Sequence, residues 1–241
     1  MTLIKSISGI RGTIGGGIGE NLTPIDIVRF TSAYAEWLKQ RNNAKRCRVA
    51  VGRDARISGE MVNNLVIGTL LGCGVDVLNL GLATTPTVEM AVIHEKTDGG
   101  IILTASHNPR QWNALKLLNE KGEFLSDTDG RKVLEIADSE SFSFADIDNL
   151  GITDEEYSFI DEHIKHIINL KYVDTDAIGK ANFRVAIDCV NSVGGIALPR
   201  LLKALGVKDI IELYTDPTGD FPHNPEPLPE HLTDISKVIK E

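Results

Sequence analysis

A serine in the middle of the chain stands where open α/β sheets place reacting groups. The apolar residues 100–103 are predicted to form a buried strand, and Ser106 follows shortly after it. Ligands of such sheets bind at the carboxyl ends of the strands. Pro109 disfavours helix at Asn108, so the chain is expected to turn here and present the Ser106 hydroxyl outward. Ser106 is therefore the first candidate for a reacting group.

Lys116 is a single charge within the apolar run 114–118, which is predicted as a further strand. The two-residue period of a strand places Lys116 on the same face as Ala114 and Leu118. One interpretation is a solvent-facing position at the edge of a sheet, the common place for a lysine. The other is a lysine near the reacting hydroxyl, with a lowered pKa, that serves as an acid or a base. The pattern alone leaves both open.

Three arginines, Arg11, Arg53 and Arg56, lie at the ends of predicted strands, in turns before helices. Such turns also offer backbone N–H groups to an anion, and a guanidinium binds phosphate with two parallel hydrogen bonds. Arginines in loops are more often simply solvated. Together with Lys116, however, these three suit a substrate that carries a phosphate group.

The residues around these candidates alternate between strand and helix patterns. Thr23 and Pro24 form an N-cap and a first helical position before an apolar stripe, which predicts a helix over 24–40. The other elements predicted for the first half are strand 47–51, helix 58–72, strand 75–80, a helix from Pro86, and strands 100–103 and 114–118. This alternation predicts an α/β/α layered domain with a mostly parallel mixed sheet.

A segment rich in Ser, Asp and Asn, residues 138–151, is the expected boundary between two domains, 1–145 and 152–241. The second domain is predicted to begin with a long helix that ends near Leu170. Acidic residues 154–156 are placed in its first turn, because they complement the helix dipole. Its further predicted elements are strand 183–188, helix 195–205, strand 209–213 and a helix from Glu230 to the end of the chain.

The two domains are expected to be related copies. Residues 48–54 (RVAVGRD) match 184–188 (RVAID), and a loop, a helix and a second strand follow each of them. Two copies are too few for a solenoid, so two domains that face a shared cleft are expected. A strand should follow the last helix to complete the second sheet, so the second domain is expected to be incomplete.

The composition disfavours several classes of protein. The chain carries a formal net charge of -9, which argues against nucleic acid or an anionic membrane as partner. No apolar stretch is long enough to cross a bilayer and the N-terminus lacks a signal-peptide pattern, so the cytoplasm is the expected location. The 3 cysteines are far apart, which argues against a disulfide framework or a zinc site.

Five motifs, in order along nearly the whole chain, resemble the α-D-phosphohexomutase family. They are SGIRG (8–12), VGRDAR (51–56), TASHNP (104–109), WNALK (112–116) and GDFPHNPEP (219–227). The family includes phosphoglucomutase, phosphomannomutase and phosphoglucosamine mutase. The resemblance implies that this chain holds the first α/β/α domain and most of the second domain of a four-domain enzyme, and that it ends before the metal-binding loop.

The resemblance also implies roles for the residues that match the motifs. The serine of the family's S-H-N-P loop is phosphorylated in the resting enzyme, which makes Ser106 the phosphoryl donor and acceptor. Lys116 and Arg11 match a basic pair beside it, with acid, base and charge-stabilising roles. His107 matches a residue that contacts phosphate or substrate. The expected phosphate-binding set is His107, Asn108 and Arg53.

The implied reaction interconverts hexose 1-phosphate and hexose 6-phosphate. Ser106 gives its phosphoryl group to a hexose monophosphate, and the 1,6-bisphosphate returns its other phosphate to Ser106. Such transfers depend on positioning and charge neutralisation, which explains the expected Mg²⁺. The ligand that this chain offers to Mg²⁺ is a phosphate oxygen on Ser106, because the family's aspartate loop is missing from the sequence.

The resemblance implies partners as well. The phosphorylated hexose is the expected substrate, hexose 1,6-bisphosphate the expected activator, and the missing C-terminal domains the expected protein partners. The isolated chain is therefore expected to be inactive in turnover. The sequence does not indicate which hexose is preferred.

Two other functions remain open. A non-catalytic sugar-phosphate binding module with the same fold would bind its ligand without phosphorylation of Ser106. A serine hydrolase would need a triad built from distant residues such as His94 and Asp54, since His107 is expected to point away from its neighbour Ser106. The glycine-flanked elbow of the α/β-hydrolases is absent from this loop.

Overall fold

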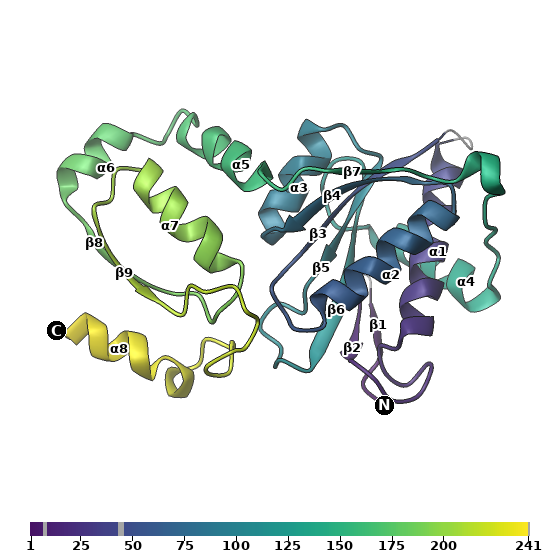
Figure 1. The fold of residues 1–241 in the computed structure, drawn as a ribbon, viewed down its shortest axis with the longest axis horizontal. Helices are drawn as coiled ribbons and strands as arrows, with labels where there is room; N and C mark the ends of the chain where they lie inside the picture. The colour runs from purple at the N-terminus through teal and green to yellow at the C-terminus, as the bar shows by residue number, and fades with distance from the viewer. Residues whose placement is uncertain (7–8, 43–45, 241) are drawn as a thin grey trace.

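The computed structural model describes residues 1–6, 9–42 and 46–240, and its largest element is a mixed sheet of seven strands (Figure 1). The strands are β1 (Ile4–Ser6), β2 (Gly9–Thr13), β3 (Arg48–Arg53), β4 (Asp76–Leu82), β5 (Gly99–Leu103), β6 (Trp112–Leu118) and β7 (Thr153–Glu155). Their order across the sheet is β1-β2-β6-β5-β3-β4-β7. Strands β5, β3, β4 and β7 pair in parallel and β2 runs in the same direction, so β1 and β6 run against the rest.

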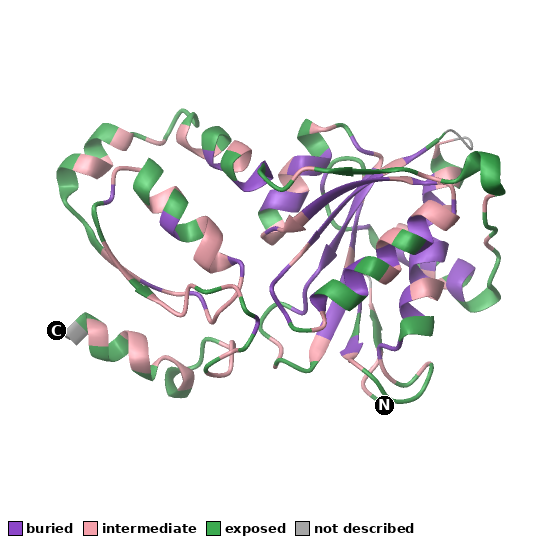
Figure 2. Ribbon diagram, in the orientation of Figure 1, coloured by how far each residue is buried: buried purple, intermediate pink, exposed green. Residues whose placement is uncertain are grey.

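Helices cover both faces of this sheet. Helices α1 (Pro24–Arg41), α2 (Gly59–Gly72) and α4 (Asp127–Ser139) pack on one face, and α3 (Thr85–His94) packs on the other. Figure 2 shows that the buried residues are concentrated in the strands and in the helices beside them. Because both faces are covered, the central strands have no exposed polar side, and residues 100–103 form a continuous buried run. The α/β/α architecture expected for the first half is confirmed.

Local sequence determines where α1 begins. Thr23 Oγ1 accepts a hydrogen bond from the Asp26 backbone N–H (3.4 Å), and Asp26 Oδ2 accepts one from the Thr23 N–H (3.2 Å). These two bonds form a capping box. Pro24 stands in the first turn, where its missing N–H costs no intrahelical hydrogen bond. The helix predicted over 24–40 is therefore confirmed, with its end one residue later.

The second part of the chain is smaller and less buried (Figures 1 and 2). Its elements are α5 (Phe159–Ile168), α6 (Thr175–Ala181), β8 (Arg184–Asp188), α7 (Gly194–Ala204), β9 (Asp209–Leu213) and α8 (Thr233–Lys240), with 3₁₀ turns at Ile147–Asn149 and Pro229–His231. Strands β8 and β9 pair in parallel, as β3 and β4 do in the first part. Both parts thus contain the strand, helix and strand that the sequence comparison of 48–54 with 184–188 predicts.

The predicted start of the first helix in the second part is wrong. Of the acidic residues 154–156, expected in its first turn, Asp154 and Glu155 instead belong to the edge strand β7 (Thr153–Glu155), in which Thr153 pairs with Val77 of β4. The helix begins only at Phe159. Charged residues are common on edge strands, where they prevent pairing with another chain, and Asp154 Oδ2 accepts a hydrogen bond from Arg48 (3.0 Å). The acidic run therefore marks a sheet edge and not a helix N-terminus.

The sequence interpretation places Arg11 at the end of a strand without giving the strand's bounds, whereas Arg11 lies in the middle of β2. Strand β1 and helices α4 and α6 have no counterpart in that interpretation. Helix α4 carries a local signal, because Ser126 Oγ accepts a hydrogen bond from the Asp129 N–H (3.2 Å) before the buried Val133 and Ile136. The pairing of β2 with β6 joins residues about a hundred positions apart. Such long-range pairing leaves no periodicity in a short segment, so the bounds of β1 and β2 could not be predicted from the local sequence.

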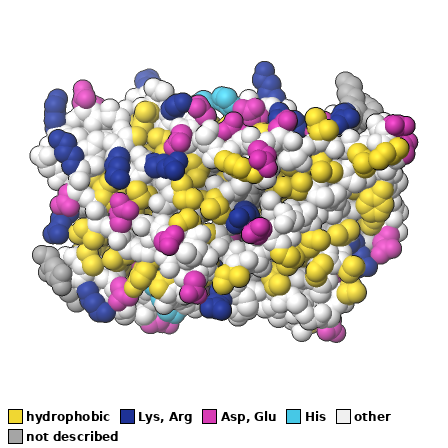
Figure 3. Space-filling view, viewed as in Figure 1, with side chains coloured by type: hydrophobic (Ala, Val, Ile, Leu, Met, Phe, Trp, Pro, Cys, Tyr) yellow, Lys and Arg dark blue, Asp and Glu magenta, His cyan; other side chains and the backbone are white. Residues whose placement is uncertain are grey.

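The surface of the fold shows no segregation of charge in the view of Figure 3. Lys and Arg side chains alternate there with Asp and Glu, and hydrophobic side chains lie between them. Within the described ranges 1–6, 9–42 and 46–240, no helix combines the length and apolar character that crossing a membrane requires.

A buried tyrosine joins α1 to the sheet and allows a test of this packing. Tyr34 Oη donates a hydrogen bond to the Leu118 carbonyl at the end of β6 (2.6 Å). Tyr34→Phe removes this donor, so we expect the free energy of unfolding in urea to fall by about 1 kcal/mol. Tyr172→Phe, at a tyrosine that is 91% exposed, is the matched control and should leave it unchanged. Equal effects of the two substitutions would contradict the proposed role of Tyr34.

Candidate functional site at the Ser106 loop

A cavity of about 250 Å³ opens where β2, β5 and β6 lie side by side. It is lined by Ser6, Gly9, Arg11, Thr104, Ala105, Ser106, His107, Asn108, Ala114, Lys116 and Phe124. Five of the six residues expected at the site therefore meet at one cavity. Arg11 comes from β2, Lys116 from β6, and the other three from the loop that follows β5.

The Ser106 side chain is exposed, and its backbone has the left-handed φ of 56°. This conformation is unusual for a residue other than glycine and persists when the surroundings hold it. The Ser106 N–H donates to Thr104 Oγ1 (3.0 Å), and Ser106 Oγ lies 3.4 Å from His107 Nδ1. The expectation that His107 points away from Ser106 is wrong, because it assumed extended backbone at this position.

Arg56 holds the loop from the inside. Its guanidinium is fully buried and donates hydrogen bonds to four backbone carbonyl groups around the serine. The acceptors and distances are Pro109 (2.9 Å), Trp112 (3.0 Å), Ser106 (2.9 Å) and Asn108 (2.8 Å). Arginine alone offers enough N–H groups in a rigid plane for this arrangement. Arg56 is therefore a positioning residue for the loop and does not face the cavity.

Asp54 fixes Arg56 in turn. Asp54 Oδ2 accepts hydrogen bonds from Arg56 Nε (3.0 Å) and from Thr104 Oγ1 (2.6 Å), and Oδ1 accepts one from the Arg56 N–H (3.0 Å). Burial raises the pKa of the Asp54 carboxyl, while Arg56 and Thr104 act to lower it. A buried charge is tolerated when it is paired and hydrogen-bonded, as this one is. Asp54, Arg56 and Thr104 thus form one buried network below Ser106.

Lys116 lies in an interior strand, because β6 is flanked by β2 and β5. The interpretation of Lys116 as a solvent-facing edge residue is therefore wrong. Burial lowers the pKa of the Lys116 ammonium, and the carboxylates of Asp54 and Glu89 only partly oppose this. The nearby Arg11 lowers the pKa of Lys116 further. A lysine with a lowered pKa exchanges a proton more readily near neutral pH, which suits an acid or a base.

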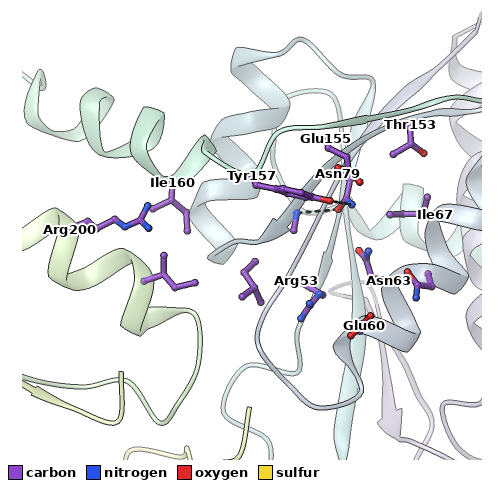
Figure 4. A pocket seen from close by; sticks show the side chains of 14 residues that line it. Arg53, Glu60, Asn63, Ile67, Asn79, Thr153, Glu155, Tyr157, Ile160 and Arg200 are labelled. Atoms are coloured by element: carbon purple, nitrogen blue, oxygen red, sulfur yellow. Dashed lines mark hydrogen bonds between the residues drawn. The ribbon is translucent and has the colours of Figure 1, made fainter. Parts of the chain in front are cut away.

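Arg53 does not join the other expected phosphate-binding residues. It lines a separate and larger cavity together with Glu60, Asn79 and Tyr157 (Figure 4). Arg53 Nη1 donates to the Asp54 carbonyl oxygen (3.2 Å). The two arginines of one motif therefore have different positions. Arg56 lies under the Ser106 loop, and Arg53 lines the second cavity.

Loops of the second part of the chain contact this network. The Phe221 ring centroid lies 5.1 Å from Arg56 Cζ, which is a cation–π contact. Gly219 packs so closely that a Cβ atom there would lie 1.8 Å from the Ala55 carbonyl oxygen. Ser192 Oγ accepts a hydrogen bond from the Ala55 N–H (3.5 Å). Ser192 and the motif at 219–227 thus touch the segment that positions Ser106.

A hydrolase triad is not assembled here. Among residues 1–6, 9–42 and 46–240, no carboxylate accepts a hydrogen bond from His107, and Asp54 is occupied by Arg56 and Thr104. His94 pairs with Glu95 (3.0 Å) on α3 and lines no part of the Ser106 cavity. The geometry therefore favours a loop that presents a serine to cations over an acyl-transfer site.

Fold and cavity together define an α/β protein with an exposed serine at the end of a central strand and two basic side chains from neighbouring strands. Family models agree with both parts. Residues 3–144 match domain I of the phosphoglucomutase/phosphomannomutase α/β/α domains, and residues 161–241 match domain II.

Individual relatives point the same way. The chain is 38% identical over 232 residues to a phosphoglucomutase/phosphomannomutase of Thermococcus kodakarensis, covering 95% of this chain and 50% of that protein. It is 31% identical over 239 residues to a phosphoglucosamine/phosphogalactosamine mutase of Sulfurisphaera tokodaii, covering 96% and 49%. A solved structure of a phosphoglucomutase/phosphomannomutase family protein from Burkholderia thailandensis aligns with a TM-score of 0.78 at 26% identity, covering 99% and 51%.

This chain belongs to the phosphoglucomutase/phosphomannomutase family, and the resemblance read from its five motifs is confirmed. It spans about half the length of the curated relatives it matches.

Family membership implies the dependence on Mg²⁺ that is typical of the family. The described part of the chain holds no group of three or more His, Cys, Asp or Glu side chains placed to bind a metal ion. The Asp54 carboxylate, which lies below Ser106, already accepts hydrogen bonds from Arg56 and Thr104. The described residues of this chain therefore do not by themselves fit a Mg²⁺ site.

The sequence interpretation considered Asp54 only for a hydrolase triad, and it missed the place of Asp54 and Thr104 in the network below Ser106. Both stand inside recognised motifs, VGRDAR and TASHNP. An acidic residue two positions before an arginine, at the end of a buried strand, was the available signal for a buried ion pair. The hydrogen bond of Thr104 to Asp54 connects two strands and has no local pattern.

The hydrogen bonds from Arg56 to four backbone carbonyl groups form a clamp on the Ser106 loop. Substitution of Arg56 tests this clamp. Arg56→Met leaves Asp54 buried without its partner and frees four carbonyl groups, so we expect the free energy of unfolding to fall by about 3–5 kcal/mol in urea. The backbone amides of residues 104–109 should exchange with deuterium much faster under native conditions. Arg46→Met breaks an exposed ion pair with Asp76 and is the matched control, for which a far smaller loss is expected. Unchanged exchange at 104–109 in a folded Arg56→Met protein would rule out the clamp.

Proposed function

We propose that this chain is the phosphoserine-carrying part of a phosphohexomutase, which interconverts hexose 1-phosphate and hexose 6-phosphate. The observation that carries the proposal is the exposed Ser106 hydroxyl at a cavity that Arg11 and Lys116 also line. A phosphoserine carries close to two negative charges and strong acceptor oxygens. Two cations beside it lower the free energy of the charged phosphoryl group during transfer.

The proposed transfer is balanced in atoms and protons. The bond between phosphorus and Ser106 Oγ breaks as a bond forms between phosphorus and the free hydroxyl oxygen of a hexose monophosphate. The hydroxyl proton passes to Ser106 Oγ, and Lys116, with its lowered pKa, is the proposed carrier. The hexose 1,6-bisphosphate then returns its other phosphate to Ser106, which restores the phosphoserine and releases the isomeric monophosphate.

Other residues of the cavity have proposed binding roles. His107 and Asn108 line the cavity next to Ser106 and are proposed to contact the phosphate or the sugar. Arg53 is left out of this set because it lines a different cavity. Hexose 1,6-bisphosphate is the proposed activator, since it supplies the phosphoryl group to an unmodified serine, and the cytoplasm is the proposed location.

The proposal predicts a covalent product on one residue. After incubation of the protein with glucose 1,6-bisphosphate and MgCl₂, intact mass spectrometry should show the addition of one phosphoryl group, and peptide sequencing should assign it to Ser106. Ser106→Ala should remain unmodified, whereas Ser141→Ala, at an exposed serine outside the cavity, should be modified normally. Lys116→Met should slow the modification by about 100-fold, the lower range of acid and base catalysis.

The same experiment separates the alternative function. A non-catalytic sugar-phosphate binding module would bind the bisphosphate, with no phosphoryl group on Ser106. Binding without modification would therefore refute the mutase proposal. Modification of a different serine or of His107 would refute the assignment of Ser106.

A further inference from the structure

A second cavity of about 780 Å³ lies between the first sheet and the second part of the chain (Figure 4). Its walls come from β3, β4, β7 and α2, and from α5 and α7 of the second part through Ile160, Ile196 and Arg200. It shares no lining residue with the cavity at Ser106. Its volume falls within the range of about 300–1,000 Å³ that is usual for ligand pockets.

Charges of both signs line this cavity, and an arginine and a glutamate among them form no ion pair in the described part of the chain. Among the residues that the structure describes, neither Arg53 nor Glu60 has a salt-bridge partner, although both line the same space. Glu155 lies on the opposite side of the cavity from Glu60 (Figure 4), and its carboxylate accepts a hydrogen bond from the Tyr157 hydroxyl. A ligand that accepts from Arg53 and donates to Glu60 would satisfy both groups at once.

The cavity also has an apolar wall. The Tyr157 ring lies directly against Gly81, where a Cβ atom would come within 2.9 Å of Tyr157 Cδ1, and Gly81 has a φ of +61°. Asn79 Oδ1 accepts from the Gly81 N–H (3.1 Å), and Asn79 Nδ2 donates to the Tyr157 hydroxyl (3.5 Å). The ring is thereby oriented by its neighbours, and Figure 4 shows it at the border of the cavity. Leu82, Ile160 and Ile196 extend this apolar surface.

The balance of charge indicates the class of ligand. The ionisable side chains that line the cavity are Arg53 and Arg200 against Glu60 and Glu155, and Arg200 is already paired with Asp161 (3.1 Å). The positive charge is therefore not in excess, which disfavours a phosphate dianion. Asn63, which is 7% exposed, adds an amide whose Oδ1 has no hydrogen-bond partner in the described structure.

We propose that this cavity binds an uncharged sugar. Sugar hydroxyl groups donate to carboxylates and accept from guanidinium and amide N–H groups, which matches the mixed set around the cavity. The C–H face of a sugar ring suits the Tyr157 ring and the aliphatic wall. The bound sugar would contact both parts of the chain, and it would do so without any residue assigned to phosphoryl transfer.

Nuclear magnetic resonance on the ¹⁵N-labelled full chain tests this site. Methyl α-D-glucopyranoside is the probe, because it is an uncharged hexose. It should cause saturable shifts of amide resonances in residues 60–64, 79–82 and 153–157, and none in 104–109. Shifts that grow linearly with concentration, or that map to 104–109, would overturn the proposal.

Substitutions give the matched comparison. Arg53→Gln should weaken binding of the glucoside about tenfold, whereas Arg184→Gln, at an exposed arginine on β8, should not change it. Tyr157→Phe keeps the ring and should retain binding, and Tyr157→Ala should lose it. Equal binding by all four variants would contradict the site.

Charged ligands and the serine variant complete the test. Inorganic phosphate and glucose 6-phosphate should cause weaker shifts at this cavity than the glucoside, and a reversal of that order would overturn the assignment to an uncharged sugar. Ser106→Ala, which abolishes the proposed phosphorylation, should bind the glucoside normally. A failure at this cavity can therefore be told apart from a failure of the mutase proposal.

Discussion

A single buried guanidinium holds the functional loop together. Arg56 is removed from solvent, and its cost of desolvation is offset by one carboxylate and four backbone carbonyl groups. Three of these carbonyl groups belong to the turn between β5 and β6, and the fourth belongs to Trp112, the first residue of β6. Without a common donor they would repel one another and take other directions. The left-handed backbone of Ser106 persists because this donor is present on the inner side of the turn.

The cations near Ser106 have different roles, because Arg56 holds the backbone of the loop whereas Arg11 and Lys116 line the cavity. The N–H groups of the Arg56 guanidinium all donate to backbone carbonyl groups or to Asp54, so none is left to bind a phosphate. The proposed phosphate contacts therefore fall to Arg11 and Lys116, which belong to strands whose register is fixed by neighbours on each side. Groups carried by paired strands keep their position better than groups on loops. The protein therefore holds Ser106, Arg11 and Lys116 in position before a ligand binds, and the ligand must adapt to them.

The sequence predicted the elements and residues whose signals are local. The helix over 24–40, the strands around Ser106, and the meeting of Arg11, Lys116 and Ser106 follow from caps, apolar runs and known motifs. The sequence could not predict that Arg56 is buried while Arg53 lines a separate cavity. The burial of Arg56 depends on carbonyl groups more than fifty positions away in the chain. The acidic residues of strand β7 predict a helix start as well as an edge strand, since edge strands and helix N-termini both favour acidic residues. His107 was misplaced because the left-handed turn at Ser106 depends on tertiary contacts.

In the proposed function, Ser106 carries a phosphoryl group that Arg11 and Lys116 stabilise as a dianion. A ³¹P nuclear magnetic resonance titration of the phosphorylated protein measures this directly. Free phosphoserine has a second pKa of about 6, and nearby cations favour the dianion and lower that pKa. We expect a phosphoserine pKa clearly below this value, which shifts back upward in Lys116→Met and in Arg11→Met. A phosphoserine pKa at or above the free value, unchanged by either substitution, would contradict the account.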